Sequence, residues 1–241
     1  MKRRNKARRQ MAATGIVLLL LLTATVLGAT QLGVMRQFLS FASIPEPANI
    51  VIDAQAILGP LPRPWRNLAQ GGEEASWEIE PVATQVQQLH PDYIRIDHIY
   101  DFYEIAQGSP GNLTFNFTKF DKILDGIAST GAKPYIALSY MPPALGGSDI
   151  VSSPDRYEDW QLVVQKTIEH VSGTRGIRDV YYEVWNEPDL FGGWKYYGGK
   201  NYLSLYDASA RGARRARGVQ PFKIGGPATT GFYKNWFDAL A

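Results

Sequence analysis

The feature that most constrains the fold is a regular alternation of short apolar runs with longer segments of helical periodicity. The runs are rich in Ile, Val and aromatic residues and are bounded by Gly, Pro or polar residues, which is typical of buried strands. They cover residues 50–52, 93–96, 135–138, 180–185 and 222–224. Their centres recur about every 40 to 45 residues without a hairpin signal between them, so the pattern predicts a parallel sheet with crossover helices.

The segments between the runs carry apolar residues at the i, i+3, i+4 spacing of helices that pack on one side. Two clear examples are residues 117–128 and 160–171. Ser153 followed by Pro154 predicts the N-cap and first residue of the second of these helices.

Parallel alternation of this kind fits a doubly wound sheet or a TIM barrel. No Gly-rich phosphate-binding loop follows the first run, so the barrel is favoured. A complete barrel has eight units in about 250 residues, whereas residues 49–241 provide about five. The sequence therefore predicts an α/β protein with a partial TIM (β/α)8 barrel, either a fragment or one whose missing strands come from elsewhere.

The first 48 residues differ from the rest of the chain. Residues 1–10 form a basic tail, residues 11–35 contain no charge, and residues 36–48 are a linker with two prolines. Roughly 20 apolar residues can span a bilayer, and the basic tail keeps the N-terminus cytoplasmic. This predicts a transmembrane helix that anchors the domain outside the cytoplasm; the alternative is a signal sequence that is cleaved, which would release a secreted domain.

Charge and composition exclude several classes of function. Six of the 25 basic residues lie in the tail, so the remaining 19 stand against 23 acidic residues, and a nucleic-acid partner is not expected. The absence of Cys excludes thiolate catalysis and Cys-ligated metals. The three histidines lie in unrelated contexts, so neither a metal nor a cofactor is predicted.

The segment 181–189 carries the clearest chemical signal. An aromatic and β-branched strand runs into Glu187, and Pro188, which cannot donate to a sheet, ends the strand there. Glu187 is thus expected at the carboxyl end of a barrel strand, the end at which active sites lie. Glu183 lies roughly 13 Å back along the strand and is predicted to pair with an interior arginine, Arg95 being one candidate.

The sequence resembles the retaining glycoside hydrolases of clan A and, most closely, family 39, which includes β-xylosidases and α-L-iduronidases. The similarity covers roughly residues 48–235, which correspond to the N-terminal part of the catalytic barrel. Asn-Glu-Pro is common to the clan, whereas the Lys-Pro strand ending in Met-Pro points to this family. The matching stretches are Tyr93-Ile94-Arg95 with Asp101 downstream, Phe120-Asp121, 131–135, 139–142 and 183–188.

The resemblance implies a glycoside hydrolase that cleaves O-glycosidic bonds of an oligo- or polysaccharide by a retaining mechanism. Glu187 would be the general acid/base, and Asn186 would hydrogen-bond the sugar 2-hydroxyl. In the clan the nucleophile ends the seventh strand, which this chain lacks. The chain alone is therefore expected to be inactive.

Arg95 matches the family's strand-2 arginine, which lies near the nucleophile. The family has His two positions later, where this chain has Asp97 followed by His98, so either residue could face the sugar. The aromatic residues Trp65, Tyr140 and Trp194 are predicted in loops after strands 1, 3 and 4, on the ligand-binding face. There a flat ring suits the C–H face of a sugar.

Two other functions fit the same sequence. The partial barrel could be an inactive carbohydrate-binding or assembly module, or it could belong to another clan A glycosidase of the cellulase or mannanase kind. A continuation of the reading frame with three more βα units and a strand-end Glu would favour the enzyme. A substrate assay would separate the families. The sequence does not set the oligomeric state.

Overall fold

The computed structural model describes residues 18–26, 28, 53, 55, 59, 61, 63–70 and 79–241. The chain divides into two units, Met1–Pro60 and Leu61–Ala241. In the first unit, residues 18–26 are helical and their leucines are exposed. Within the described part of the chain, no helix has both the length and the apolarity needed to cross a membrane. Most of the predicted anchor at 11–35, and all of the predicted first strand at 50–52, lie outside the described residues.

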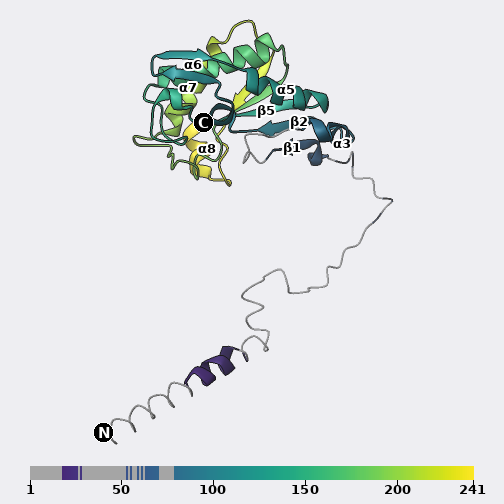
Figure 1. Cartoon of the computed structure of the whole chain (residues 1–241), viewed down its shortest axis with the longest axis vertical. Coiled ribbons are helices and arrows are strands. Elements are labelled where there is room, and N and C mark those ends of the chain that lie inside the picture. The colour runs from purple at the N-terminus through teal and green to yellow at the C-terminus, as the bar shows by residue number, and fades with distance from the viewer. Residues whose placement is uncertain are drawn as a thin grey trace, which may run out of the picture. The chain divides into compact units, whose positions relative to one another are not determined.

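The second unit is built on a five-stranded parallel sheet with the order β1-β2-β5-β6-β7 (Figure 1). Because the register sets Arg95 beside Tyr135 and Tyr135 beside Tyr181, equivalent side chains of neighbouring strands lie next to each other. The predicted parallel sheet is confirmed for the four later strands. The strands are β1 Asn67–Ala69, β2 Tyr93–Ile96, β5 Lys133–Leu138, β6 Val180–Val184 and β7 Phe222–Gly225.

Helices and short 3-10 turns connect the strands. The two predicted helical segments correspond to α5 and α6, and α6 continues into a π-helical turn, η5. The helices are α3 Ala83–Gln87, α4 Ile99–Tyr103, α5 Thr118–Ser129, α6 Tyr157–Ile168, α7 Tyr202–Arg215 and α8 Lys234–Leu240, and the turns are η2 Pro64–Arg66, η3 Glu80–Val82, η4 Pro143–Leu145 and η5 Glu169–Thr174.

The core lies on one face of the sheet, which we term the outer face. Successive strand residues point to opposite faces, and in β2 and the first half of β5 buried residues alternate with partly exposed ones. In β2 the buried residues are Ile94 and Ile96, and they join buried side chains of α5, α6 and α7 in one cluster. The other face, the inner face, carries Tyr93, Arg95 and Tyr135, which are only partly buried.

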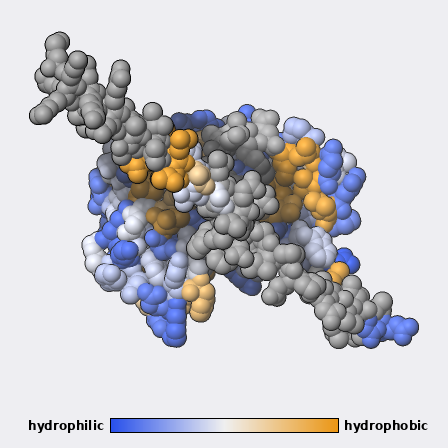
Figure 2. All heavy atoms as spheres, turned by 90° about the horizontal axis from the view of Figure 1, so that it is seen from below, coloured by the Kyte–Doolittle hydropathy of each residue, from blue (hydrophilic) through white to orange (hydrophobic). Residues whose placement is uncertain are grey.

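Some large hydrophobic side chains remain at the surface of the second unit. They include Trp65, Leu190, Phe191 and Phe232. Figure 2 shows hydrophobic side chains in several separate areas of this view, which also includes the exposed leucines of the first unit.

Two details of the predicted elements are wrong. An antiparallel hairpin, β3 Ala106–Ser109 and β4 Asn112–Phe115, lies between β2 and β5 where no hairpin was expected. The hairpin was not predicted because β3 has no apolar run. Gly108 and Gly111 adopt the positive φ angles that are needed near its turn.

Helix α6 begins at Tyr157, after the predicted start at Ser153 and Pro154. The preceding residues continue a loop that is tied to η4, because the Asp155 N–H donates to the Leu145 carbonyl at 3.0 Å. The fold class, a partial α/β barrel, is unaffected by these differences.

Candidate active site

The site forms at the carboxyl ends of β2, β5 and β6. These parallel strands end at one edge of the sheet, with Ile96 beside Ile136 and Leu138 beside Val184. The next residues along the chain are therefore brought together although they are far apart in sequence. They are Asp97 and His98 after β2, Ser139 and Tyr140 after β5, and Trp185, Asn186 and Glu187 after β6.

Glu187 is held by its backbone on both sides. Its N–H donates to the Ala228 carbonyl beyond β7 at 2.9 Å, and its own carbonyl accepts from the N–H of Phe191 at 2.7 Å. Glu187 has φ +46° and Trp185 has φ +68°, a region that costs about 1 to 3 kcal/mol per non-Gly residue. Strain of this kind persists only where the surroundings impose it, so the turn that presents Glu187 is a fixed feature of the site.

The amide of Asn186 is hydrogen-bonded at both ends. Its Nδ2 donates to the Tyr140 hydroxyl at 2.7 Å, and its Oδ1 accepts from Nη2 of Arg95 at 2.8 Å. Side chains from β2, from the segment after β5 and from the segment after β6 thus converge next to Glu187.

Arg95 forms an ion pair with Glu183, as predicted. Nη2 of Arg95 lies 2.5 Å from Oε1 of Glu183, and the Glu183 side chain is only 10% exposed. Burial lowers the pKa of Arg95, but the hydrogen bond and charge of Glu183 outweigh burial and raise the pKa overall. Glu183 is therefore engaged inside the sheet, and Arg95 links it to Asn186.

Asp97 lies on the other side of the same guanidinium. Its Oδ2 is 3.6 Å from Nη1 of Arg95, while its buried Oδ1 has no hydrogen-bond partner in the described part of the chain. Burial raises the pKa of Asp97, and the charges of Arg95 and His98 only partly offset this.

His98 turns toward the helix that follows it. Its Nδ1 lies 2.7 Å from Oδ2 of Asp101, and its ring stacks on Phe102 with centroids 4.3 Å apart. The Tyr140 ring is roughly perpendicular to the His98 ring, with the two centroids 4.5 Å apart, and Oδ1 of Asp101 accepts the Tyr140 N–H at 3.1 Å. His98 and Asp101 thereby fix the backbone of Tyr140.

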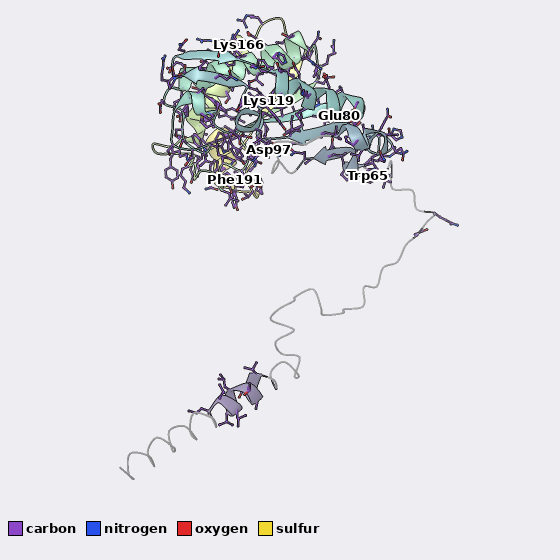
Figure 3. The ribbon with its side chains drawn as sticks, in the orientation of Figure 1. Trp65, Glu80, Asp97, Lys119, Lys166 and Phe191 are labelled. Atoms are coloured by element: carbon purple, nitrogen blue, oxygen red, sulfur yellow. The ribbon has the colours of Figure 1, made fainter. Side chains whose placement is uncertain are left out.

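The predicted location of Trp65 is wrong. Trp65 lies in η2, directly before β1, which begins at Asn67. The amino end of β1 lies beside that of β2, as the bond from the Asp92 N–H to the Arg66 carbonyl shows. Figure 3 accordingly shows Trp65 far from Phe191 at the opposite end of the sheet.

Two other aromatic residues do not offer an open ring face. Trp194 is fully buried, with its ring 5.3 Å from Trp185 and Nζ of Lys200 5.1 Å from its centroid. Tyr140 is 2% exposed. The prediction that these rings are sugar platforms is therefore corrected, because packing covers both.

Sequence reasoning missed two residues beside the site. Phe191 is 42% exposed and lies 5.9 Å from Tyr140, so its ring is accessible near Glu187. Tyr135 lies on the inner face, where burial and then the charge of Glu183 raise its pKa to about 12. The alternation of side chains along β5, together with the parallel register, could have placed Tyr135 beside Arg95.

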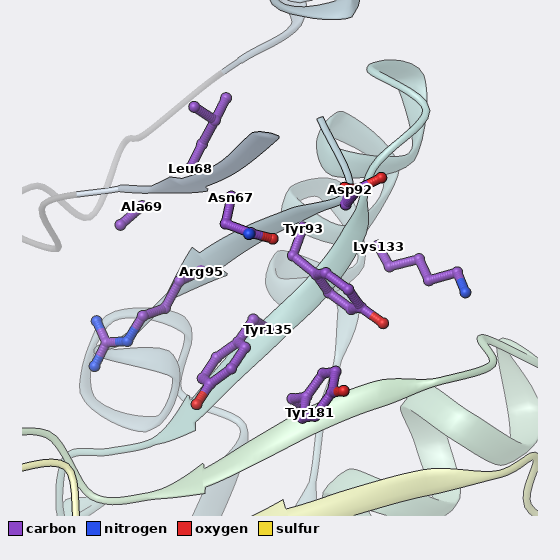
Figure 4. A pocket seen from close by; sticks show the side chains of 9 residues that line it. All are labelled: Asn67, Leu68, Ala69, Asp92, Tyr93, Arg95, Lys133, Tyr135 and Tyr181. Atoms are coloured by element: carbon purple, nitrogen blue, oxygen red, sulfur yellow. The ribbon is translucent and has the colours of Figure 1, made fainter. Parts of the chain in front are cut away.

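A cavity of about 810 Å³ lies against the inner face of the sheet. Figure 4 shows Arg95, Tyr135 and Tyr181 projecting into it from β2, β5 and β6. No group of three or more His, Asp or Glu side chains in the described residues is arranged to hold a metal ion.

Comparisons with known proteins agree with this geometry. The sequence profile of glycosyl hydrolases family 39 matches residues 48–241. A β-xylosidase of Geobacillus stearothermophilus is 32% identical over 134 residues, 51% of this chain and 26% of that protein. A β-xylosidase of Caldicellulosiruptor saccharolyticus is 31% identical over 130 residues, 49% of this chain and 26% of that protein.

Solved structures show the same relationship. A monomeric β-xylosidase from Caulobacter crescentus CB15 is 27% identical, with a TM-score of 0.56 over 68% of this chain and 36% of that chain. The fold also matches the GH39 enzyme from Xanthomonas axonopodis pv. citri, with 23% identity and a TM-score of 0.56 over 68% of this chain and 35% of that chain. The matched region spans about a quarter of each curated relative and just over a third of each structure. The chain belongs to glycosyl hydrolases family 39.

Proposed function

We propose that this chain supplies the acid/base half of the active site of a retaining glycosidase that acts on β-xylosides. The observation that carries the proposal is the strained, tethered position of Glu187 at the carboxyl end of β6, next to Asn186. The substrate class is taken from the β-xylosidases that are 31% and 32% identical to about half of the chain.

In the proposed mechanism, Glu187 protonates the glycosidic oxygen as the bond to the leaving group breaks. A second carboxylate attacks the anomeric carbon and forms a covalent glycosyl-enzyme intermediate. Glu187 then takes a proton from the water that hydrolyses this intermediate. Asn186 hydrogen-bonds the sugar 2-hydroxyl, an interaction that strengthens in the transition state.

The nucleophile is proposed to come from a part of the barrel beyond residue 241. A nucleophilic carboxylate must be open to the sugar and about 5 to 5.5 Å from the acid/base. Glu183 is held by Arg95 inside the sheet, and Asp97 is buried, so neither offers a free carboxylate at the rim.

The catalytic unit is further proposed to work outside the cytoplasm, anchored by residues 11–35. The support is the uncharged stretch that follows six basic residues in the sequence. Sedimentation with membranes after carbonate washing is expected. A mature N-terminus near Gly28 would instead indicate signal cleavage and secretion.

The proposal is tested with aryl β-xylosides on the 241-residue chain and on the whole polypeptide that contains it. The whole polypeptide is expected to hydrolyse them and the chain alone is not. Glu187→Gln should abolish most of the activity, whereas Glu158→Gln, an exposed position on α6, should not change it. A whole polypeptide that binds xylosides without cleaving them would identify a carbohydrate-binding module instead.

A further inference from the structure

The environment of Tyr140 restricts what this side chain can do. Its ring is 2% exposed and is surrounded by the rings of His98, Trp185 and Phe191, with centroids 4.5, 5.0 and 5.9 Å away. Because the side chain is almost completely buried, no face of Tyr140 is open to a sugar. Its hydroxyl, by contrast, meets a polar group of the site.

That polar group is the amide of Asn186. A side-chain amide can rotate by half a turn, which exchanges its donor and acceptor ends. Here Arg95 determines which end of the amide faces it. A guanidinium can only donate hydrogen bonds, so the acceptor Oδ1 of Asn186 must point toward Arg95. The Tyr140 hydroxyl accepts from Nδ2 and holds the other end at 2.7 Å.

We propose that Tyr140 is a positioning residue that acts through its hydroxyl, fixing Asn186 so that its second Nδ2 proton is directed to a substrate hydroxyl. This inference rests on the proposed function for the identity of that hydroxyl, the 2-hydroxyl of a xyloside. The hydroxyl stays protonated at neutral pH, since burial raises the pKa of Tyr140 to about 12.

Tyr140→Phe is the informative variant because it removes the hydroxyl and keeps the packed ring. The same molecule offers a matched control, since Nδ2 of Asn235 donates to the Tyr196 hydroxyl at 3.1 Å. Tyr196→Phe removes a tyrosine–asparagine hydrogen bond of the same kind that is exposed to solvent, and it keeps the partly buried ring.

The first measurement uses the ¹⁵N-labelled 241-residue chain and needs no ligand. The side-chain amide signals of Asn186 are assigned by their loss in Asn186→Asp. Tyr140→Phe is expected to shift these signals and to speed their exchange with solvent by about tenfold, while Tyr196→Phe leaves them unchanged. Unaltered Asn186 signals in folded Tyr140→Phe would overturn the proposal.

The second measurement uses the whole polypeptide with an aryl β-xyloside and its 2-deoxy analogue. Tyr140→Phe should lower kcat/KM for the xyloside about tenfold, equivalent to ~1.4 kcal/mol, and change the 2-deoxy substrate by less than about twofold. Equal losses on both substrates would assign Tyr140 a structural role and overturn the proposal. If wild type cleaves neither substrate, the proposed function fails, whereas the amide signals still decide whether Tyr140 positions Asn186.

Discussion

The two faces of the sheet differ in what holds them together. The outer face is a continuous apolar layer, in which Ile136 and Val184 are fully buried among helices. The inner face carries charged and hydroxyl groups, with Arg95, Glu183 and Tyr135 in contact beside a cavity. The outer face therefore stabilises the fold by apolar burial. The inner face orients the side chains at the carboxyl ends of the strands, since Arg95 binds Asn186. Mutations on the two faces should consequently differ in how much they lower the free energy of unfolding and in whether they change its pH dependence.

The largest effect on stability is expected on the outer face. Ile136→Ala deletes three carbons from a fully buried side chain in the middle strand, which should lower the free energy of unfolding by about 2 to 5 kcal/mol. Urea denaturation of the chain measures this. A change below 1 kcal/mol would mean that the outer face is loosely packed, and the contrast between the faces would disappear.

An intermediate effect is expected from the inner ion pair. Arg95→Met should destabilise the fold by about 1 to 3 kcal/mol, because the carboxylates of Glu183 and Asp97 lose their common partner in a mostly buried site. The control is Arg211→Met, which breaks the exposed pair with Asp207 on α7 and should cost at most about 1 kcal/mol. Equal losses for both variants would show that the inner network is no more stabilising than a surface pair.

The smallest effect is a pH dependence at Asp97. Its folded-state pKa is raised, chiefly by burial, so the native state binds its proton more tightly than the unfolded state does. The stability that Asp97 contributes should therefore be greatest below the ordinary aspartate pKa and be lost as pH rises through the raised value. Asp97→Asn should remove this dependence, which urea denaturation of both proteins between about pH 3 and pH 7 would measure. Parallel stability curves for wild type and variant would contradict this account of Asp97.

The sequence predicts the outer face far better than the inner one. Strands β2, β5, β6 and β7 were predicted because each carries a short apolar run, and in β2, β5 and β6 this run contains buried residues. Strand β1, Asn67–Ala69, carries no such run and was not predicted, whereas the strand expected at 50–52 lies outside the described residues. Because β1 was not predicted, Trp65, which directly precedes it, was expected at the carboxyl ends of the strands and not at their amino ends.

Within the site, the residues next to distinctive sequence signals were identified and those defined by packing were not. Proline after Glu187 marks a strand end, and the pairing of Glu183 with Arg95 follows from a carboxylate inside a strand. The burial of Trp194 and Tyr140 depends on which segments of the chain pack over them, and the residues next to them in sequence do not predict this packing. The proposed positioning role of Tyr140 depends on its hydrogen bond to Asn186, a residue 46 positions away, and no local sequence pattern predicts that contact.

The central claim, that Glu187 is the general acid/base, is tested most directly by the dependence of its mutation on the leaving group. The measurement compares kcat/KM of wild-type and Glu187→Gln whole polypeptide over aryl β-xylosides whose leaving groups range from acidic to weakly acidic phenols. Since poor leaving groups need protonation, the loss should grow along the series, reaching about 10² to 10⁴-fold for the poorest. A loss of the same size for every leaving group, or no loss, would contradict the assignment.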